Sequence, residues 1–539
     1  MTEWLLAADL AALPLSTATE VHSWRPFLAV LASGLAVFLI LASARHPTVR
    51  EGWSILAAVV KFGLVASMIP DVMAGLRPTS HLWTLAPGVE LAFRADPLGM
   101  VFALVASGLY IVTAVYSIGY LRTDDARNQP RFFAALAASL SATIGVAFAT
   151  NLLVLLFFYE LLTVATYPLV THIETREARR AGYKYLVYAF SGGAIVFFGT
   201  IVVLWAADSV TFAAGGIDAL ADADRLVARI GFAALVVGFG VKAAVMPLHS
   251  WLPSAMIAPT PVSGLLHAVA VVKAGVFGIA RTVLDVFGPS LSDALGLSTV
   301  LAIVAGATIL LASLIALRQD NLKRLLAYST IAQLSYIVLG VALLSPAAIG
   351  GAVLHLPAHA FAKLTLFFCA GALHVELHVD AVSEATGVGS RMPLTMGAFA
   401  IGSASMVGIP LFAGFISKWH LLYGGFQTEL LVVVALLIVS GALNVAYFWP
   451  VVFAAFFERP DTGEQKPIVT APFGGSDTGP GHDPFDRPDG MFGETTPYML
   501  GPIIATGALV LIFGLVPWAT GFFDLAGLVV ELSTGVNPS

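Results

Sequence analysis

The chain has 539 residues, of which 58% are hydrophobic and only 11% are charged, whereas soluble chains carry about 25% charged residues. This composition, a mean hydropathy of +0.88 and apolar runs along the whole length exclude a soluble protein and predict one with many membrane spans. The net charge of -6 argues against a nucleic-acid partner, and the single cysteine, Cys369, excludes an intrachain disulfide or a cysteine-bound metal cluster.

Apolar runs of helical length recur along the chain and predict an all-α integral membrane fold with about 14 spans. A helix needs about 20 apolar residues to cross the hydrocarbon core. In chain order the expected spans are 27–44, 53–70, 98–120, 131–149, 151–171, 184–206, 228–249, 262–284, 298–317, 326–345, 348–374, 394–425, 428–457 and 498–526. Only Asn151 separates the fourth span from the fifth.

Basic residues favour the odd-numbered connections between these spans. They are Arg45, Arg50, Arg122, Arg127, Arg131, Arg176, Arg179, Arg180, Lys184, Arg318, Lys323, Arg324, Arg391, Arg459, Lys466 and Arg487. Cytoplasmic loops are enriched in Lys and Arg. We therefore expect the odd connections in the cytoplasm, both termini outside, and the protein in the cell (inner) membrane.

Several ionisable side chains fall inside the expected spans, although a charge at the bilayer centre costs about 2.5–3.5 kcal/mol on insertion scales. Residues of this kind normally face the protein interior and find partners there. The set is Glu160, Lys242, His267, Lys273, His355, His359, Lys363 and Lys418.

The chemistry of these groups favours proton transfer. Burial disfavours the charged form of a lysine and a nearby carboxylate favours it, so a moving carboxylate makes the amine take up or release a proton. Histidine can relay protons between such sites. His355, His359 and Lys363 share one helix stripe, which predicts a short polar wire, although Pro357 lies within the stripe and can distort it.

Other interpretations exist for some of these residues. Lys61 and Lys418 can extend to the headgroups, and Glu160 can be a purely structural partner for a lysine. His355 and His359 have the spacing of a helical metal pair, but no acidic third ligand follows closely. The sequence therefore favours a proton relay over a hydrogen-bonded interface and over a metal site, and it predicts no metal and no cofactor.

Two of the expected spans contain both a proline and a lysine. Pro247 follows Lys242, and Pro410 precedes Lys418. Proline breaks or kinks a helix, and in lipid a break persists only where protein or water satisfies the freed backbone groups. Paired interrupted spans are typical of transporters with inverted repeats. The alternative is that both prolines mark packing kinks.

At these residues the chain resembles a known family. The run from Val241 to His267, and the segments 96–99, 116–120, 320–333 and 408–418, are similar to those of proton-conducting antiporter-like subunits. That family includes the large membrane subunits of respiratory complex I and the A and D subunits of Mrp-type cation/proton antiporters. The resemblance covers nearly the whole chain and is closest to the Mrp D subunit. It implies two inverted five-helix repeats, each with a broken helix.

The resemblance also implies roles for the buried residues. Glu160 and Lys242 match the family's glutamate and lysine of the first half-channel. Lys273 resembles the central connecting lysine, with His267 beside it.

In the second half, His355, His359 and Lys363 lie where the central axis continues. Lys418 matches the terminal residue of the second half-channel. That position is glutamate in one complex I subunit and lysine in others, so Lys418 argues against that one subunit.

The expected function is therefore that of a proton-translocating subunit in a multisubunit Na+/H+ antiporter. Its partners would be other membrane subunits, and its substrates protons and Na+. It would not be an enzyme. The alternatives are a proton-pumping subunit of an NADH–quinone oxidoreductase or hydrogenase-type complex, and a structural scaffold with degenerate channels.

Three regions are expected along the chain. They are N-terminal transmembrane helices over 1–129, a proton-conducting core over 130–425, and C-terminal transmembrane helices over 426–539. Residues 458–497 are rich in Pro, Gly and Asp without an apolar period, which predicts a cytoplasmic linker loop.

Overall fold

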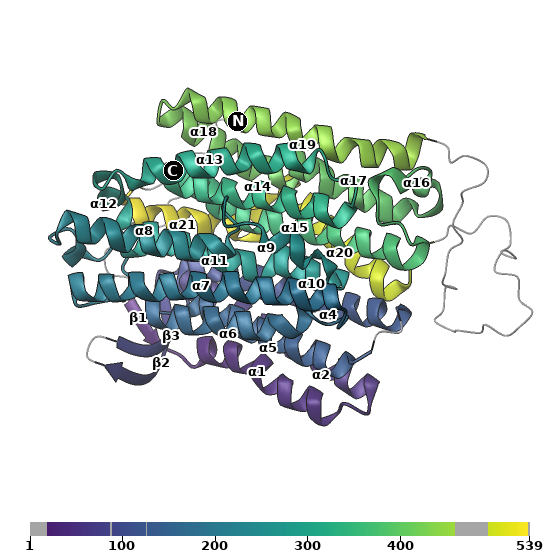
Figure 1. The fold of residues 1–539 in the computed structure, drawn as a ribbon. Helices are drawn as coiled ribbons and strands as arrows, with labels where there is room; N and C mark the ends of the chain where they lie inside the picture. Colours follow the sequence, from purple (N-terminus) through teal and green to yellow (C-terminus); the bar gives the residue numbers. More distant parts are fainter. Residues whose placement is uncertain (1–18, 87–88, 125–126, 459–493, 537–539) are drawn as a thin grey trace, which may run out of the picture.

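The chain folds into a bundle of helices that run roughly along one common direction (Figure 1). A computed structural model describes residues 19–86, 89–124, 127–458 and 494–536. In these ranges 12 helices are long and apolar enough to cross a membrane, so the chain is a multi-pass membrane protein, as predicted.

The helices that correspond to single expected spans are α1 (Arg25–Ala42), α2 (Pro47–Ala66), α4 (Pro97–Thr123), α5 (Gln129–Phe148), α6 (Leu152–Val170), α7 (Arg176–Ala207), α8 (Arg225–Lys242), α13 (Leu297–Ala316), α14 (Leu322–Ala342), α15 (Pro346–Leu377) and α19 (Leu431–Phe457). Helix α20 (Pro497–Leu515) covers the first part of the last expected span. The span from 260 to 286 is composite and consists of α10 (Thr260–Gly264), the π-helical turn η5 (Leu265–Val269), α11 (Val271–Arg281) and a second π-helical turn, η6 (Thr282–Val286).

Shorter helices complete the fold. They are α3 (Ile69–Met73), α9 (Trp251–Ser254), α12 (Gly288–Ala294), α16 (Val388–Arg391), α17 (Pro393–Val407), α18 (Ala413–Gln427) and α21 (Phe522–Thr534), with the 3-10 turns η3 (Asp218–Leu220), η4 (Ala255–Ile257), η7 (Val382–Glu384) and η8 (Pro517–Thr520).

Polar side chains fix where several helices begin. Asn151 caps α6, since its Oδ1 accepts a hydrogen bond of 2.9 Å from the backbone N–H of Val154. Asp96 caps α4 in the same way through Gly99, at 2.8 Å. Such caps satisfy N–H groups that have no partner inside the helix. Asn151, the residue expected to separate the spans 131–149 and 151–171, is therefore the N-cap at which α6 begins.

The expected span 228–249 was wrong at its end. Helix α8 ends at Lys242 itself, and Ala244 has φ +56, in the left-handed region. Proline disfavours the helical conformation in the residue before it, so the chain has to leave the helix before Pro247.

Two other expected spans are each divided. The span 394–425 is α17 and α18, separated by a turn that contains Gly408, with φ +93, and Pro410. The span 498–526 ends at Leu515 as α20, and after η8 and Gly521 the chain continues as α21. The left-handed Gly408 ends α17, whereas α20 ends just before Pro517 and the left-handed Gly521 precedes α21.

A small sheet that was not predicted caps one end of the bundle (Figure 1). Its order is β1 (Thr19–His22), β2 (Leu76–Ala86), β3 (Val89–Arg94), with β1 parallel and β3 antiparallel to β2. We call this end the sheet end, and the opposite end, where α19 finishes and α20 begins, the loop end. Most of the predicted linker 458–497 lies outside the described residues.

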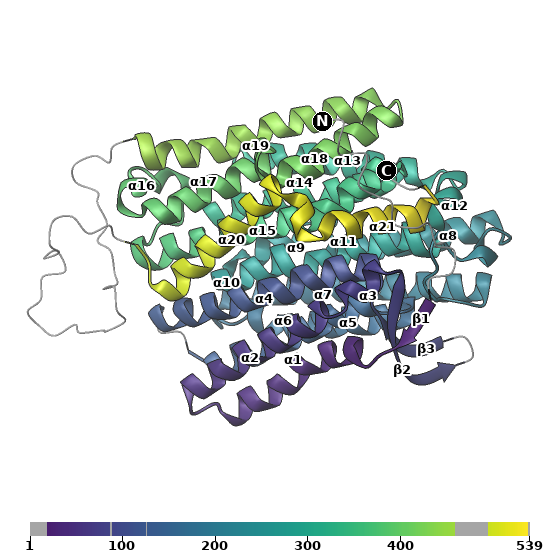
Figure 2. The same ribbon diagram turned by 180° about the vertical axis from the view of Figure 1, so that it is seen from behind.

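The core of the bundle is formed by α15 and the composite span Thr260–Val286. Of the most apolar stretch of each, 94% and 100% of the residues are buried, compared with 39% for α7 and α19. Figure 2 shows α20 and α21 lying across the back of the bundle, where they contact α4 and α15. The central helices are thus shielded from lipid, which lets them carry polar groups.

Candidate functional site

Lys242 is the last residue of α8 and is fully buried. Its Nζ donates a hydrogen bond to the carbonyl oxygen of Tyr159 in α6 and lies 3.3 Å from the centroid of the Tyr159 ring. A lysine amine over a tyrosine ring makes a favourable cation–π contact. The end of α8 therefore places an amine directly against the middle of α6.

Glu160 is the next residue of α6, beside Lys242 but not paired with it. Both of its carboxylate oxygens are buried and have no hydrogen-bond partner among the described residues. The carboxylate rests on Gly193 of α7, where an added Cβ would collide with Oε1. Its charge acts on Lys242, although the two form no ion pair within 4.0 Å.

The break after α8 lies against α11. A Cβ on Gly275 would collide with the backbone of Lys242 and Ala243, so α11 touches the chain where α8 ends. Two residues earlier in α11, Lys273 donates from Nζ to the Leu356 carbonyl of α15 at 2.8 Å. His267 lies in the π-helical turn η5, a feature that often marks functional sites.

Helix α15 carries the predicted stripe of titratable groups, and Pro357 does not end it. The His355 and His359 ring centroids are 6.0 Å apart, and His355 Nδ1 is 2.8 Å from Ser417 Oγ in α18. Lys363 Nζ donates to the Leu326 carbonyl of α14 at 3.1 Å.

Two histidines at the centre have no hydrogen-bond partners in the described part of the chain. Both ring nitrogens of His267 and of His359 are buried and unpartnered. The charges of Lys273 and Lys363, together with His267 and His355, act on His359, so these side chains form one electrostatic group. Buried polar atoms normally have a protein or water partner.

Lys418 lies in α18, one turn after the second break. Its Nζ donates to the carbonyl oxygens of Met406, and of Val407 at 3.3 Å, which end α17. The terminal carbonyls of a helix have no internal partners and attract positive charge. The Lys418 side chain is 8% exposed, so extension to the headgroups was the wrong alternative. It was also wrong for Lys61, which is fully buried in α2.

A cluster of uncharged polar residues beside Lys363 and Lys418 was not predicted. The Tyr447 hydroxyl of α19 contacts Asn444 and donates to Ser329 Oγ at 3.1 Å, while Gln333 Nε2 lies 3.5 Å from Asn444 Oδ1. Asn444 and Gln333 are fully buried. The signal in the sequence was an amide in each of two apolar helices, which a search for charges overlooks.

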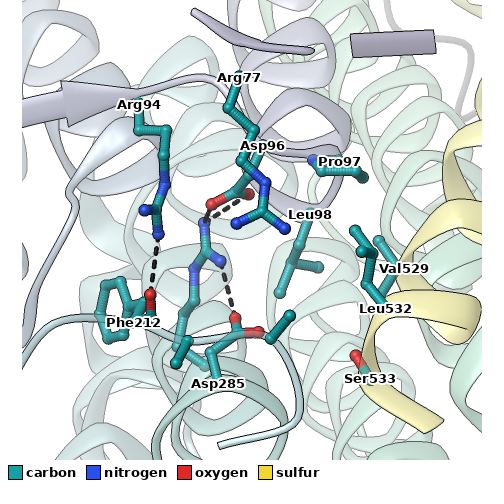
Figure 3. Close-up of a pocket in the computed structure, with 13 residues that line it drawn as sticks. Arg77, Arg94, Asp96, Pro97, Leu98, Phe212, Asp285, Val529, Leu532 and Ser533 are labelled. Atoms are coloured by element: carbon teal, nitrogen blue, oxygen red, sulfur yellow. Dashed lines mark hydrogen bonds and ion pairs between the residues drawn. The ribbon is translucent and has the colours of Figure 1, made fainter. Parts of the chain in front are cut away.

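An ion cluster at the sheet end was also not predicted (Figure 3). Arg281 of α11 donates to both carboxylate oxygens of Asp96 at 2.8 Å and to Asp285 at 2.7 Å. Burial raises the pKa of the Asp96 carboxyl, but the charges of Arg281 and Arg94 outweigh it and hold the pKa below its usual value.

The cluster surrounds a cavity of about 30 Å³, also lined by Arg77 and Ser533, which is large enough to hold water. Within the described ranges, no three His, Cys, Asp or Glu side chains lie close enough together to hold a metal ion.

The fold and the site define a polytopic membrane protein whose titratable groups lie at two helix breaks and along the buried central helices. Residues 149–444 match the family model described as NADH:quinone oxidoreductase/Mrp antiporter, transmembrane, and residues 83–133 match that of the N-terminus of complex I chain 5. Because the first match covers more than half of the chain, the protein belongs to this NADH:quinone oxidoreductase/Mrp antiporter family.

Curated relatives come from both branches of the family. The chain is 31% identical to NADH-quinone oxidoreductase subunit N of Desulforudis audaxviator, over 91% of this chain and 94% of that one. It is also 31% identical to Na(+)/H(+) antiporter subunit A1 of Staphylococcus aureus, but there it spans only 47% of the longer relative.

Two solved structures share the fold. The Mrp complex of Dietzia sp. contains a chain that matches with a TM-score of 0.80 at 20% identity, covering 95% of this chain and 98% of that one. An archaeal membrane-bound sulfane sulfur reductase contains another, with a TM-score of 0.80 at 23% identity, covering 95% and 99%. At these identities the likeness shows the fold alone.

Proposed function

We propose that the chain is the proton-translocating subunit of a multisubunit monovalent cation (Na+)/H+ antiporter, in the place of the Mrp D subunit. The observation that carries the proposal is how the amines are held. Lys242, Lys273, Lys363 and Lys418 each donate to a main-chain carbonyl and form no ion pair in the described residues.

A carbonyl oxygen suits a group that gains and loses a proton. It accepts a hydrogen bond from a neutral amine as well as from an ammonium, so protonation breaks no salt bridge. Moving a charge among four such sites therefore disturbs the fold little. A structural lysine in this interior would instead be expected to form a fixed ion pair with a carboxylate.

The proposed pathway follows the buried groups in order. Glu160 and Lys242 form the first half, Lys273 with His267 and His359 the centre, and His355, Lys363 and Lys418 the second half. Water bound at the unpartnered atoms of Glu160, His267 and His359 would complete the connections.

Access would follow the two breaks. On the loop side of Lys242, the Tyr188 hydroxyl lies 2.8 Å from Ser250 Oγ, and Lys184 donates to Ser254 Oγ at 3.0 Å, so polar groups line the chain between α8 and α10.

The remaining expectations belong to the same proposal. The proton-conducting core is placed at 130–425, between the transmembrane helices of 1–129 and 426–539, with the two halves as inverted repeats. The protein is placed in the cell membrane, with the loop end in the cytoplasm and other membrane subunits around it. Protons and Na+ are its proposed substrates.

A second candidate is a proton-pumping subunit of a redox complex such as NADH–quinone oxidoreductase. The observation that favours this candidate is that the match to the subunit N relative covers 94% of that relative's length. Purification of the intact complex separates the candidates, since iron–sulfur or flavin subunits would identify a redox complex and small membrane subunits alone an antiporter.

The proposal is tested with Lys242→Ala and Glu160→Ala in the full complex. Proton movement is followed with a pH-sensitive dye in inside-out membrane vesicles after Na+ is added. We expect transport to fall by at least about 10²-fold, which is the usual cost of removing a proton-transfer group, with normal amounts of complex in the membrane. Transport at the wild-type rate in either variant would overturn the proposal.

A further inference from the structure

One buried lysine takes no part in the proposed pathway. Lys61 in α2 is fully buried, and its Nζ has no hydrogen-bond partner among the described residues. The four pathway lysines each have a carbonyl partner, so Lys61 differs from them. An unpartnered polar group is costly to bury, and methionine would fill similar space without that cost. Packing therefore does not account for the amine.

Among the described residues, the helices that pack on α2 offer Lys61 no counter-charge. Helices α1, α4 and α5 pack on α2 and contain no Asp or Glu, and their charged residues are Arg25, Arg122 and Arg131. The ring of Tyr110 in α4 lies 5.4 Å from Lys61 Nζ, and the Tyr110 hydroxyl is buried and unpartnered as well. A tyrosine ring stabilises a nearby cation, so the site can hold an ammonium without a fixed partner.

The buried face of α2 leads from Lys61 to the loop end. Ser54 is fully buried and lies two turns earlier on the same face, about 10 Å along the axis. Beyond it, the carboxylate of Glu51 is paired with Arg122 and, at 3.6 Å, with Arg50 of the same helix. The Arg122 side chain is 46% exposed, so this row of polar side chains begins at the surface.

We propose that Lys61 is a second proton-binding site, reached from the loop end along α2 through Glu51 and Ser54. The ligand is a proton, which adds to the neutral amine to give an ammonium beside the Tyr110 ring and leaves again by the reverse step. The site lies outside the helices of the main pathway, but α4 and α5, which pack on α2, also contact α15 and α6 of that pathway. In this proposal Lys61 is therefore a lateral proton store for the main pathway. The inference rests on the proposed transport function.

The test is Lys61→Met in the full complex, with proton transport in vesicles and thermal stability measured together. We expect transport to fall about 10-fold, which is less than the roughly 10²-fold loss expected for a group in the main pathway, because Lys61 only supplies that pathway. The midpoint of thermal unfolding should be unchanged or higher, because methionine removes the unpartnered amine. Val59→Met, on the half-exposed outer face of the same helix, is the matched control and should transport normally.

The outcomes separate this inference from the proposed function. Wild-type transport in Lys61→Met, with transport lost in Lys242→Ala, overturns the Lys61 site and leaves the main pathway standing. Wild-type transport in Lys242→Ala overturns the proposed function itself. If Lys61→Met fails to accumulate in membranes, Ser54→Ala tests the inference instead. Normal proton transport in Ser54→Ala would overturn the proposed route along α2.

Discussion

The two helix breaks hold their lysines in different ways. At the first, Lys242 closes α8 and its amine crosses to α6, where it meets the Tyr159 carbonyl and ring. At the second, Lys418 follows the break and its amine turns back to the terminal carbonyls of α17. Glu160 acts electrostatically on the first amine, whereas the second acts on His355 and Lys363.

This difference shows that one residue type at a break can have two physical roles. The first amine is anchored to a different helix beside a carboxylate, so its affinity for a proton depends on where that carboxylate lies. The second amine also completes the end of a helix, so it adds to the stability of α17. Both halves contain a lysine at a broken helix, but among the described residues an acidic side chain acts on the first lysine and none acts on the second.

The largest expected effect comes from moving the carboxylate without removing it. In Gly193→Ala the new Cβ collides with Glu160 Oε1 and displaces the carboxylate from its place beside Lys242. A displacement of about 1 Å at a reacting group can lower the rate by about 10²-fold. We expect a loss of that order in vesicle proton transport.

Gly397→Ala is the matched control, because an added Cβ there meets no atom within 4 Å. It should transport like the wild type. If Gly193→Ala also transports protons at the wild-type rate, the position of the Glu160 carboxylate does not control proton transfer at Lys242.

A smaller effect separates the two lysines by stability. Lys418→Met removes the amine donor of the Val407 carbonyl and leaves the Met406 carbonyl only Gln333 Nε2, at 3.5 Å. This loss at the end of α17 should destabilise the fold by about 1–3 kcal/mol. Lys242→Met should cost less, because Tyr159 lies within α6 and its carbonyl also accepts from Thr163 Oγ1 at 3.4 Å. The measurement is the thermal unfolding midpoint in detergent, and equal midpoints would contradict the capping role.

The smallest expected effect depends on pH and concerns the loop end of α6, the helix that anchors Lys242. Burial, and to a smaller extent the charge of Arg131, lower the pKa of His172 to about 4. The folded state thus binds fewer protons than the unfolded state between about pH 6.5 and 4, so stability falls as the pH falls through that window.

The variant His172→Leu removes this proton uptake on unfolding. Its unfolding midpoint should therefore change less than that of the wild type between pH 7 and pH 4.5. Parallel curves for the two proteins would show that His172 keeps an ordinary pKa in the folded state.

The sequence located the buried titratable groups well but not their partners. Seven of the eight candidate residues are buried, and Glu160 is half-buried with both carboxylate oxygens buried, because a charged residue in a long apolar run normally faces the protein interior. A direct contact between Glu160 and Lys242 does not form in the structure, since the Tyr159 carbonyl receives the amine instead. Patterns of residue type do not show which main-chain oxygen an amine will reach.

Helix ends were predicted less well than helices. The apolar lengths of α13 and α14 were evident, but the end of α8 at Lys242 and the division of 498–526 were not, because they depend on local left-handed turns. The sheet was missed for a related reason. Strand β1 is 4 residues long and pairs with β2 more than 50 residues away, so local alternation gives little signal.

By itself, the sequence determined that this protein spans a membrane many times and buries amines, a carboxylate and imidazoles, because hydropathy and segment length are local properties. Only the tertiary structure decided how those groups are held. Lys242 and Lys273 each meet a carbonyl 83 residues away in the chain, and Arg281 meets Asp96 across 185 residues. Contacts at such separations arise from the packing of helices. Packing brings together side chains that are far apart in the sequence, and a local sequence pattern cannot reveal such pairs.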